Sequence, residues 1–189
     1  MATIIYKIEL LTNWHTGSGL YGGTDANLTV IKNRAGLPYI PGKTIKGLIR
    51  EGAETICALH PDLVTSDFIG DIFGWEDKKP NASFFGNAEL SKYLSENIKD
   101  EQKPFLYSTI ASTAIDANGL AQDKSLRQIE TTVPLVLYGA IVDFPATRDS
   151  NPDYGKQLTY CLQWIKKLGY KRTKGFGRCV VSIHSINHA

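Results

Sequence analysis

Two prolines followed by a helical repeat constrain the fold most strongly, between Gly36 and Arg50. Pro38 and Pro41 bias the residues before them toward extended backbone, so no helix can run through this stretch. Apolar and small residues then recur at helical spacing, namely Ile45, Leu48, Ile49, Gly52, Ala53 and Ile56. The sequence therefore predicts a rigid extended elbow that leads into an amphipathic helix ending near Leu59.

Three cations lie on the side of this helix away from the apolar stripe: Lys43, Lys46 and Arg50. With the free backbone N–H groups of a helix start, they would form an anion-binding end suited to phosphate. The alternative is an ordinary amphipathic helix with a solvated basic face. A nucleotide-binding P-loop is excluded, because the first glycine of that motif would fall where the chain has Leu37.

The basic residues are concentrated in two parts of the chain, although all 189 residues together carry a formal net charge of only +2. Five Lys or Arg and no acidic residue fall between 26 and 50. Six Lys or Arg and no acidic residue fall between 164 and 178. If the fold brings the two stretches together, the protein has a basic face of the kind that binds nucleic acid. We expect this convergence.

Cysteine usage and hydropathy favour a cytoplasmic protein without a membrane segment. Cys57, Cys161 and Cys179 are odd in number and far apart, so they form neither a disulfide framework nor a zinc pattern. The first residues lack the layout of a signal peptide, and no apolar run reaches the roughly 18 residues that a membrane span needs.

A glycine-rich segment at 13–27 follows the first apolar stretch. It contains Gly17-Ser-Gly-Leu-Tyr-Gly22, which satisfies the G-x-G-x-x-G fingerprint of dinucleotide sites. That fingerprint must open a helix and be followed by an acid about 20 residues on. Here a loop continues through Asp25, and the next acid is Glu51 inside the basic helix. We therefore expect no nucleotide or flavin cofactor.

Alternation and helical spacing along the chain indicate an α+β fold. Apolar stretches predict strands at 4–11, 83–90, 104–111, 133–144 and 179–186. A second helix is predicted over 158–168, and a polar hairpin at about 112–130 has a tight turn at Asp116-Ala-Asn-Gly119. The strong elements follow the order β-α-β-β-α-β, which is the ferredoxin-like arrangement that RNA-recognition domains also use. We predict a single domain over residues 1–189, with inserted loops and the protruding hairpin.

Three blocks of the sequence resemble the RAMP superfamily, and specifically the backbone subunits of type III CRISPR effector complexes. Residues 36–50 look like the signature G-x-P-x-I-P-G-S-S-L-K-G-x-x-R, with Lys43-Thr44 in place of Ser-Ser. The segment Leu126-Arg-Gln-Ile-Glu-Thr-Thr-Val-Pro134 resembles a second family motif, L-R-x-x-E-x-V. Residues 169–178 resemble the terminal glycine loop, although Tyr170 replaces its second glycine.

The resemblance implies a modified RNA-recognition fold whose copies line up along a CRISPR RNA. A repeating subunit must hold every guide sequence alike, so it grips phosphates and sugars rather than base edges. Phe176 is placed to stack on a base. The residues expected to contact the RNA backbone are His15, Lys43, Lys46, Arg50, Lys171, Arg172, Lys174 and Arg178.

The hairpin at about 112–130, which carries Lys124 and Arg127, would serve as a thumb. In the family that this chain resembles, such a thumb interrupts the pairing of guide and target RNA at regular intervals. The expected partners are therefore CRISPR RNA, complementary target RNA, further copies of this chain and other type III CRISPR subunits. No membrane partner is expected.

The resemblance also implies target RNA cleavage by an aspartate in the loop between the first strand and the first helix. Asp25 is the only carboxylate between Glu9 and Glu51. Family members place their Asp about three residues before a V-I-K stretch, where this chain has Asn27. We expect Asp25 to help activate a ribose 2′-hydroxyl for attack on the adjacent phosphate, with a loosely held divalent ion, Mg or Mn. His15 lies close to the same loop in sequence.

Two alternatives remain open from the sequence. The chain could be a non-catalytic RAMP subunit that caps one end of such a complex. It could also be a stand-alone ribonuclease that matures CRISPR RNA by acid–base chemistry, for which His15 is the one available histidine near the basic elements.

Overall fold

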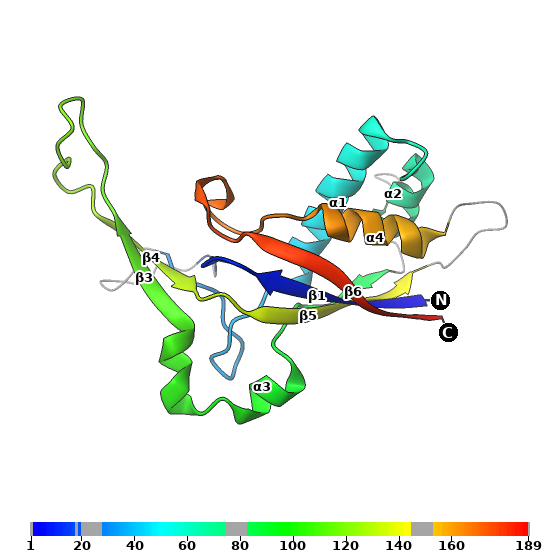
Figure 1. Cartoon of the computed structure of the whole chain (residues 1–189), viewed down its shortest axis with the longest axis horizontal. Helices are drawn as coiled ribbons and strands as arrows, with labels where there is room; N and C mark the ends of the chain where they lie inside the picture. The colour runs from blue at the N-terminus through cyan, green and yellow to red at the C-terminus, as the bar shows by residue number, and fades with distance from the viewer. Residues whose placement is uncertain (1, 18, 20–27, 75–82, 145–152, 189) are drawn as a thin grey trace.

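A four-stranded antiparallel sheet with two helices on one face forms the centre of the fold in the computed structural model, which describes residues 2–17, 19, 28–74, 83–144 and 153–188 (Figure 1). The strand order is β2-β5-β1-β6. The strands are β1 (Ala2–Leu10), β2 (Phe84–Phe85), β5 (Val136–Phe144) and β6 (Cys179–His188). Helices α1 (Gly42–Leu59) and α4 (Tyr154–Trp164) pack against each other above the sheet. The predicted ferredoxin-like α+β fold is confirmed.

Alternating burial explains why one face of the sheet receives the helices. In β1, Ile4, Tyr6 and Ile8 are buried, whereas the residues between them are half-buried or exposed. The apolar stripe predicted for the first helix packs onto this face, and Ile45 and Ile49 have no more than 1 % of their surface exposed. The core is thus the shared interior of the sheet, α1 and α4.

Two insertions extend this core. After α1, a short helix α2 (Ser66–Phe73) packs Phe68 and Ile72 into the interior. Between β2 and β5 the chain forms α3 (Lys92–Asn97), a 3-10 helix η1 (Asp100–Leu106) and a separate two-stranded ladder, β3 (Tyr107–Ser112) with β4 (Arg127–Thr132). Figure 1 shows α3 on the opposite side of the sheet from α1 and α4, while the loop of the ladder projects far from the sheet. No helix in the described part of the chain is long and apolar enough to cross a membrane.

The β3–β4 ladder confirms the predicted hairpin. Tyr107 pairs with Thr132 at its base and Ser112 with Arg127 at its outer end. The tight turn is also present, since Asp116 Oδ1 accepts hydrogen bonds from the backbone N–H groups of Asn118 and Leu120 at 2.9 Å each.

Three predicted elements differ from the structure. The strand predicted over 83–90 is reduced to β2, Phe84–Phe85, followed by isolated bridges at Ala88 and Glu89. Helix α4 ends at Trp164 rather than Leu168, because the chain turns extended there and Lys167 pairs with Arg178 beside β6. Ile165 and Leu168 are buried as expected. They belong to an extended segment, although their spacing in the sequence continues the helical repeat. The strand predicted from Pro104 begins only at Tyr107, since the preceding residues form the 3-10 helix η1.

The three cysteines are free thiols, as expected from their spacing. Cys161 and Cys179 are buried, and burial raises the pKa of the Cys161 thiol to about 12 and that of Cys179 to about 11. Both therefore behave as small apolar core residues.

Candidate nucleic-acid interface

The glycine loop, residues 169–178, is fastened to the segment that follows β1. The backbone N–H of Tyr170 donates to the His15 carbonyl at 2.9 Å, and that of Gly177 donates to the Asn13 carbonyl at 2.9 Å. Thr12 adds two bonds, since its hydroxyl donates to the Gly175 carbonyl at 3.0 Å and accepts from the N–H of Arg178 at 3.0 Å. The loop is therefore held over residues 12–16 at several points along its length.

Glycine is required at two positions of this loop. Gly169 has φ +82° and Gly177 has φ +62°, in the left-handed region that disfavours other residues. A Cβ at Gly169 would collide with the His15 carbonyl, and a Cβ at Gly177 would collide with the Leu168 carbonyl. The close approach of the loop to the rest of the chain thus depends on both glycines.

His15 lies beneath the glycine loop rather than on the surface. Only 3 % of its surface is exposed, and its Nδ1 lies 2.7 Å from the Glu130 carbonyl oxygen. A carbonyl can only accept, so Nδ1 carries the hydrogen of this bond. The ring also meets Tyr170 edge-on, with centroids 5.8 Å apart. His15 therefore joins the loop to strand β4, and its predicted contact with RNA stays a prediction.

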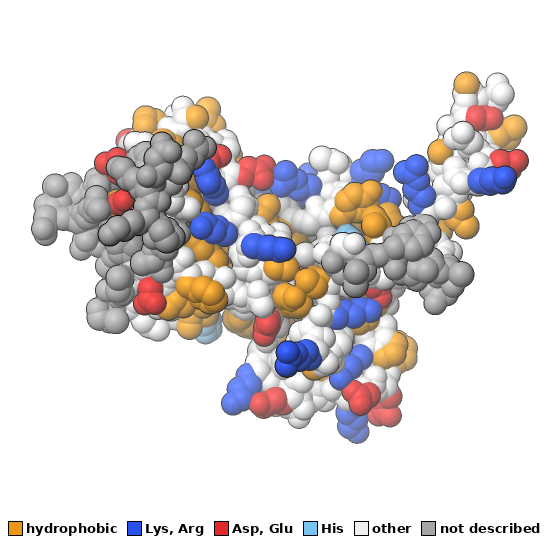
Figure 2. Space-filling model, turned by 180° about the vertical axis from the view of Figure 1, so that it is seen from behind, with side chains coloured by type: hydrophobic (Ala, Val, Ile, Leu, Met, Phe, Trp, Pro, Cys, Tyr) orange, Lys and Arg blue, Asp and Glu red, His pale blue; other side chains and the backbone are white. Residues whose placement is uncertain are grey.

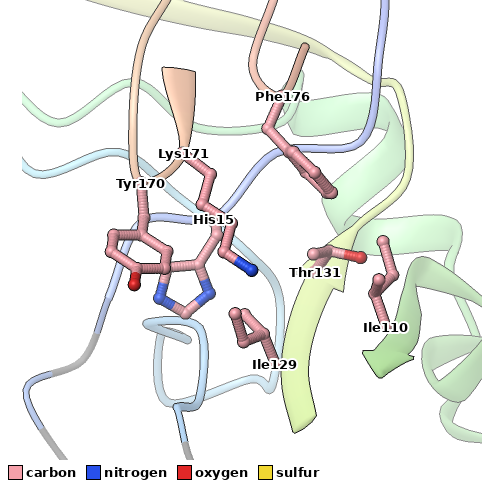
Figure 3. Close-up of a pocket in the computed structure, with 7 residues that line it drawn as sticks. All are labelled: His15, Ile110, Ile129, Thr131, Tyr170, Lys171 and Phe176. Carbon is pink, nitrogen blue, oxygen red and sulfur yellow. The ribbon is translucent and has the colours of Figure 1, made fainter. Parts of the chain in front are cut away.

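A small hollow separates the loop from the base of the hairpin (Figure 3). Figure 3 shows the Phe176 ring directed toward Thr131 and Ile110. Phe176 is half-buried here, so its packing fixes the loop relative to the hairpin. The hollow is lined by His15, Ile110, Ile129, Thr131, Tyr170, Lys171 and Phe176.

Three predicted cations of the loop have no carboxylate within ion-pair distance among the described residues: Lys171, Lys174 and Arg178. Lys171 is half-buried, and its Nζ lies 5.9 Å from the centroid of the Tyr170 ring. Lys174 lies in the 3-10 turn η2 (Arg172–Lys174) and is exposed, as is Arg178. Their charges are available to an anionic ligand.

Arg172 connects the glycine loop to α1. Its two terminal nitrogens each lie 3.2 Å from a carboxylate oxygen of Glu51, in a two-pronged ion pair. This ion pair brings the second basic stretch to α1 at Glu51, one residue beyond the first basic stretch, and the convergence of the two stretches into one basic face stays a prediction. However, Lys46 lies about 140° around the helix from Glu51 at 100° per residue. Its Nζ is 5.7 Å from the Phe85 ring centroid on the β2 side.

The start of α1 is not an open anion site, which corrects the prediction from the sequence. Gly42 is buried, and its N–H donates to Asn87 Oδ1 at 3.0 Å. The N–H groups of Thr44 and Ile45 donate to the Pro41 carbonyl at 2.9 and 3.1 Å. Three of the first four N–H groups thus have acceptors within the protein. Asn87, in the segment after β2, accepts from Gly42, and the Pro41 carbonyl accepts from the other two.

The side chains of the helix cations nevertheless reach the surface. Lys43 is exposed and Lys46 half-buried. Arg50 is exposed and pairs with Glu54 on the same helix, with Nε 2.7 Å from Oε1. Figure 2 shows Lys and Arg side chains spread across one face of the molecule, between the helices and the protruding hairpin.

A polar cluster that the sequence did not predict joins the base of the hairpin to the extended segment before α1. Glu130 accepts from the N–H of Val30 at 2.9 Å and from Lys32 Nζ at 2.7 Å. Lys32 Nζ also lies 4.0 Å from the centroid of the Tyr107 ring, and the Tyr107 hydroxyl donates to the Gly36 carbonyl at 2.7 Å. Burial raises the pKa of Tyr107 far above its ordinary value, so the hydroxyl stays a donor.

This cluster borders an open cleft of about 560 Å³ between the hairpin, η1 and the elbow. A signal for it existed in the sequence, because Lys32 stands in an acid-free stretch and Glu130 is the only acid between Asp123 and Asp143. Pairing them required knowing that the hairpin folds back on the elbow.

Some predicted site residues stand apart from this surface or outside the described residues. Lys124 and Arg127 are exposed on the hairpin, and Lys124 has a left-handed backbone with φ 55°. Asp25 lies outside the described residues. Among the residues that the structure describes, no three His, Cys, Asp or Glu side chains gather closely enough to hold a metal ion.

Comparisons with known proteins agree with the fold. The family model described as the RAMP superfamily matches residues 7–180. One similar solved structure is a chain of Type III-B Cmr-beta bound to cognate target RNA, with a TM-score of 0.72, 13% identity and 96% of both chains covered. A second is a chain of Type III-B Cmr-beta in the apo state, with a TM-score of 0.70, 13% identity and 97% of both chains covered. No curated protein matched in the comparison of sequences.

Proposed function

The chain belongs to the RAMP superfamily, and on this premise we propose that it is a guide-binding backbone subunit of a type III CRISPR effector complex. Several copies hold one CRISPR RNA by its sugar–phosphate backbone, next to other subunits of the complex. The hairpin acts as the thumb that divides the guide–target duplex. The observation that carries the proposal is the glycine loop, whose rigidly fastened backbone presents cations that have no acidic partner in the described parts of the chain.

The loop suits a ligand of any sequence. Lys171, Lys174 and Arg178 offer charge without acidic partners among the described residues, whereas the hydrogen-bonding groups beneath the loop, including His15, are engaged with the protein itself. Ammonium and guanidinium groups contact phosphates, which are the same at every nucleotide. The affinity is therefore expected to depend on salt and not on base sequence.

The proposal includes cleavage of the paired target RNA. The 2′-hydroxyl of one ribose transfers its proton to the Asp25 carboxylate and attacks the adjacent phosphorus. The O2′–P bond forms, the P–O5′ bond breaks, and the departing 5′ oxygen takes up a proton from solvent water. The products are a 2′,3′-cyclic phosphate and a 5′-hydroxyl end. A loosely held divalent ion, Mg or Mn, would add stabilisation of the charge that develops on the phosphate.

Removing two of the free loop cations is expected to weaken RNA binding. Each phosphate contact on a single strand contributes a salt slope of about 0.7, so two contacts correspond to about 25-fold in affinity between 0.1 M and 1 M salt. We expect Lys171→Ala/Lys174→Ala to bind an unstructured 15-nucleotide RNA about 25-fold more weakly at 0.1 M salt. Its slope of log K against log salt should be lower by about 1.4. Fluorescence anisotropy with a labelled RNA measures both quantities.

A matched control removes the same charge elsewhere. Lys92 and Lys99 are exposed near α3, on the opposite side of the sheet from the helices. Lys92→Ala/Lys99→Ala should bind as the wild type does. Equal weakening in the two double variants would mean that only net charge matters, and the glycine loop would lose its assigned role.

A further inference from the structure

Trp164 separates two clefts along the seam between α1 and α4, outside the glycine loop. The first is a basic cleft of about 140 Å³ that includes Lys166, Lys167 and Arg172. The second is a mainly apolar groove of about 260 Å³ that includes the rings of His60, Tyr160 and Trp164. Lys166 borders both clefts, so they form one continuous surface.

The basic cleft offers charge to an anion. Lys166 and Lys167 are exposed and have no carboxylate within ion-pair distance among the described residues. Glu51 also lines the cleft, but its carboxylate is paired with Arg172. The cleft therefore keeps a positive excess, and it adjoins the glycine loop through Arg172.

The apolar groove exposes the aromatic ring of Trp164, on which a base could stack. Trp164 packs its Cδ1 against Gly52, where a Cβ would lie 3.3 Å from that atom. Even so, 48% of the Trp164 surface stays exposed, and Leu59 on the groove rim is 62% exposed. At about 260 Å³, the groove is smaller than the roughly 300–1,000 Å³ of sites that enclose a whole small molecule. It suits one part of a longer ligand.

We propose that this seam binds one nucleotide of the single-stranded guide RNA as it leaves the glycine loop. The base stacks on Trp164 in the apolar groove, and the adjoining phosphate lies at Lys166 and Lys167 in the basic cleft. Exposed aromatic rings beside cations bind single strands in this way without reading sequence. The assignment rests on the proposed function, since it extends the same RNA path by one nucleotide.

The charges favour RNA over a protein partner in this groove. An apolar groove rimmed by acidic and basic pairs would suit many proteins, whereas the rim beside Trp164 holds two cations without acidic partners among the described residues. The groove adjoins the basic cleft at Trp164 and Lys166, and the cleft reaches the glycine loop at Arg172. The groove, the cleft and the loop therefore form one basic surface.

Three variants test the proposal with unstructured 15-nucleotide oligo(A) and oligo(U) RNAs. Trp164→Leu is expected to weaken binding of oligo(A) about tenfold, because stacking on one base is worth on the order of five- to 150-fold in affinity. Lys166→Ala/Lys167→Ala leaves the ring in place and should weaken both RNAs, with a salt slope lower by about 0.7 because one phosphate contact is lost. Tyr93→Leu, which alters a 74% exposed ring on α3, is the control and should bind as the wild type does.

Tryptophan emission supplies an independent readout. The chain has three tryptophans, of which Trp14 is only 1% exposed and Trp75 lies outside the described residues. In a Trp75→Phe background, RNA should therefore quench Trp164, and the quenching should vanish when Trp164→Leu is added. If the wild type binds RNA with unchanged emission, and both seam variants bind as tightly as it does, the nucleotide site is refuted while the proposed function stands. The nucleotide site is also refuted if a protein subunit of the complex changes the emission of Trp164 and RNA does not. Absence of RNA binding by the wild type would instead refute the proposed function.

Discussion

Gly177→Ala is expected to lower the free energy of unfolding by about 2–5 kcal/mol, because left-handed backbone costs an alanine about 1–2 kcal/mol and overpacking about 1–3 kcal/mol. Gly177 has φ +62°, and a Cβ there would collide with the Leu168 carbonyl oxygen. Two backbone hydrogen bonds hold Gly177 at this position: its N–H donates to the Asn13 carbonyl, and its carbonyl accepts from the Leu168 N–H. Urea denaturation followed by circular dichroism measures the change.

The control for this prediction lies two residues away in the same loop. Gly175 also has a left-handed backbone, with φ +88°, but a Cβ there would meet no atom within 4 Å. Gly175→Ala is therefore expected to cost only about 1–2 kcal/mol. Equal losses in the two variants would show that Leu168 does not confine Gly177, and the rigid attachment of the loop would be wrong.

Asp25→Ala is expected to slow cleavage of complementary target RNA by at least about 100-fold, the lower end of what general acid–base catalysis contributes. Guide binding should be unchanged, because the proposed phosphate contacts lie in the glycine loop and the seam beside it. The measurement uses the complex assembled with its guide, under single-turnover conditions, with a labelled target whose cut sites are mapped.

Two further variants sharpen this test. Asp25→Asn keeps the size of the side chain but cannot accept the proton, so it should lose as much activity as Asp25→Ala. Glu101→Ala removes an exposed carboxylate from η1 and should cut at the wild-type rate. Regular cutting by Asp25→Asn at an unchanged rate would remove Asp25 from the reaction, and the chain would then act as a binding subunit alone.

Local sequence signals were sufficient for the central part of the fold. Pro38 and Pro41 set the start of α1, and the apolar stripe from Ile45 to Ile56 set its buried face. The alternation in β1 and the turn at Asp116 also depend on neighbouring residues only. Such features need no knowledge of distant contacts.

Features that depend on distant contacts could not be predicted in this way. The Gly42 N–H group, expected to be free at the start of α1, donates to Asn87, which lies there in space although it is 45 residues away in sequence. Arg172 was expected to face phosphate, but Glu51 on α1 already pairs with it. The exposed ring of Trp164 is equally a product of packing, since it depends on Gly52.

The salt dependence of binding to RNAs of unrelated sequence tests the central claim most directly. If the glycine loop holds phosphates through Lys171, Lys174 and Arg178, the wild-type protein should bind unstructured oligomers of different sequence within about threefold of one another. The slope of log K against log salt should be about −2 or steeper, since three contacts contribute about 0.7 each. A flat salt dependence, or an affinity that follows base sequence, would contradict the account.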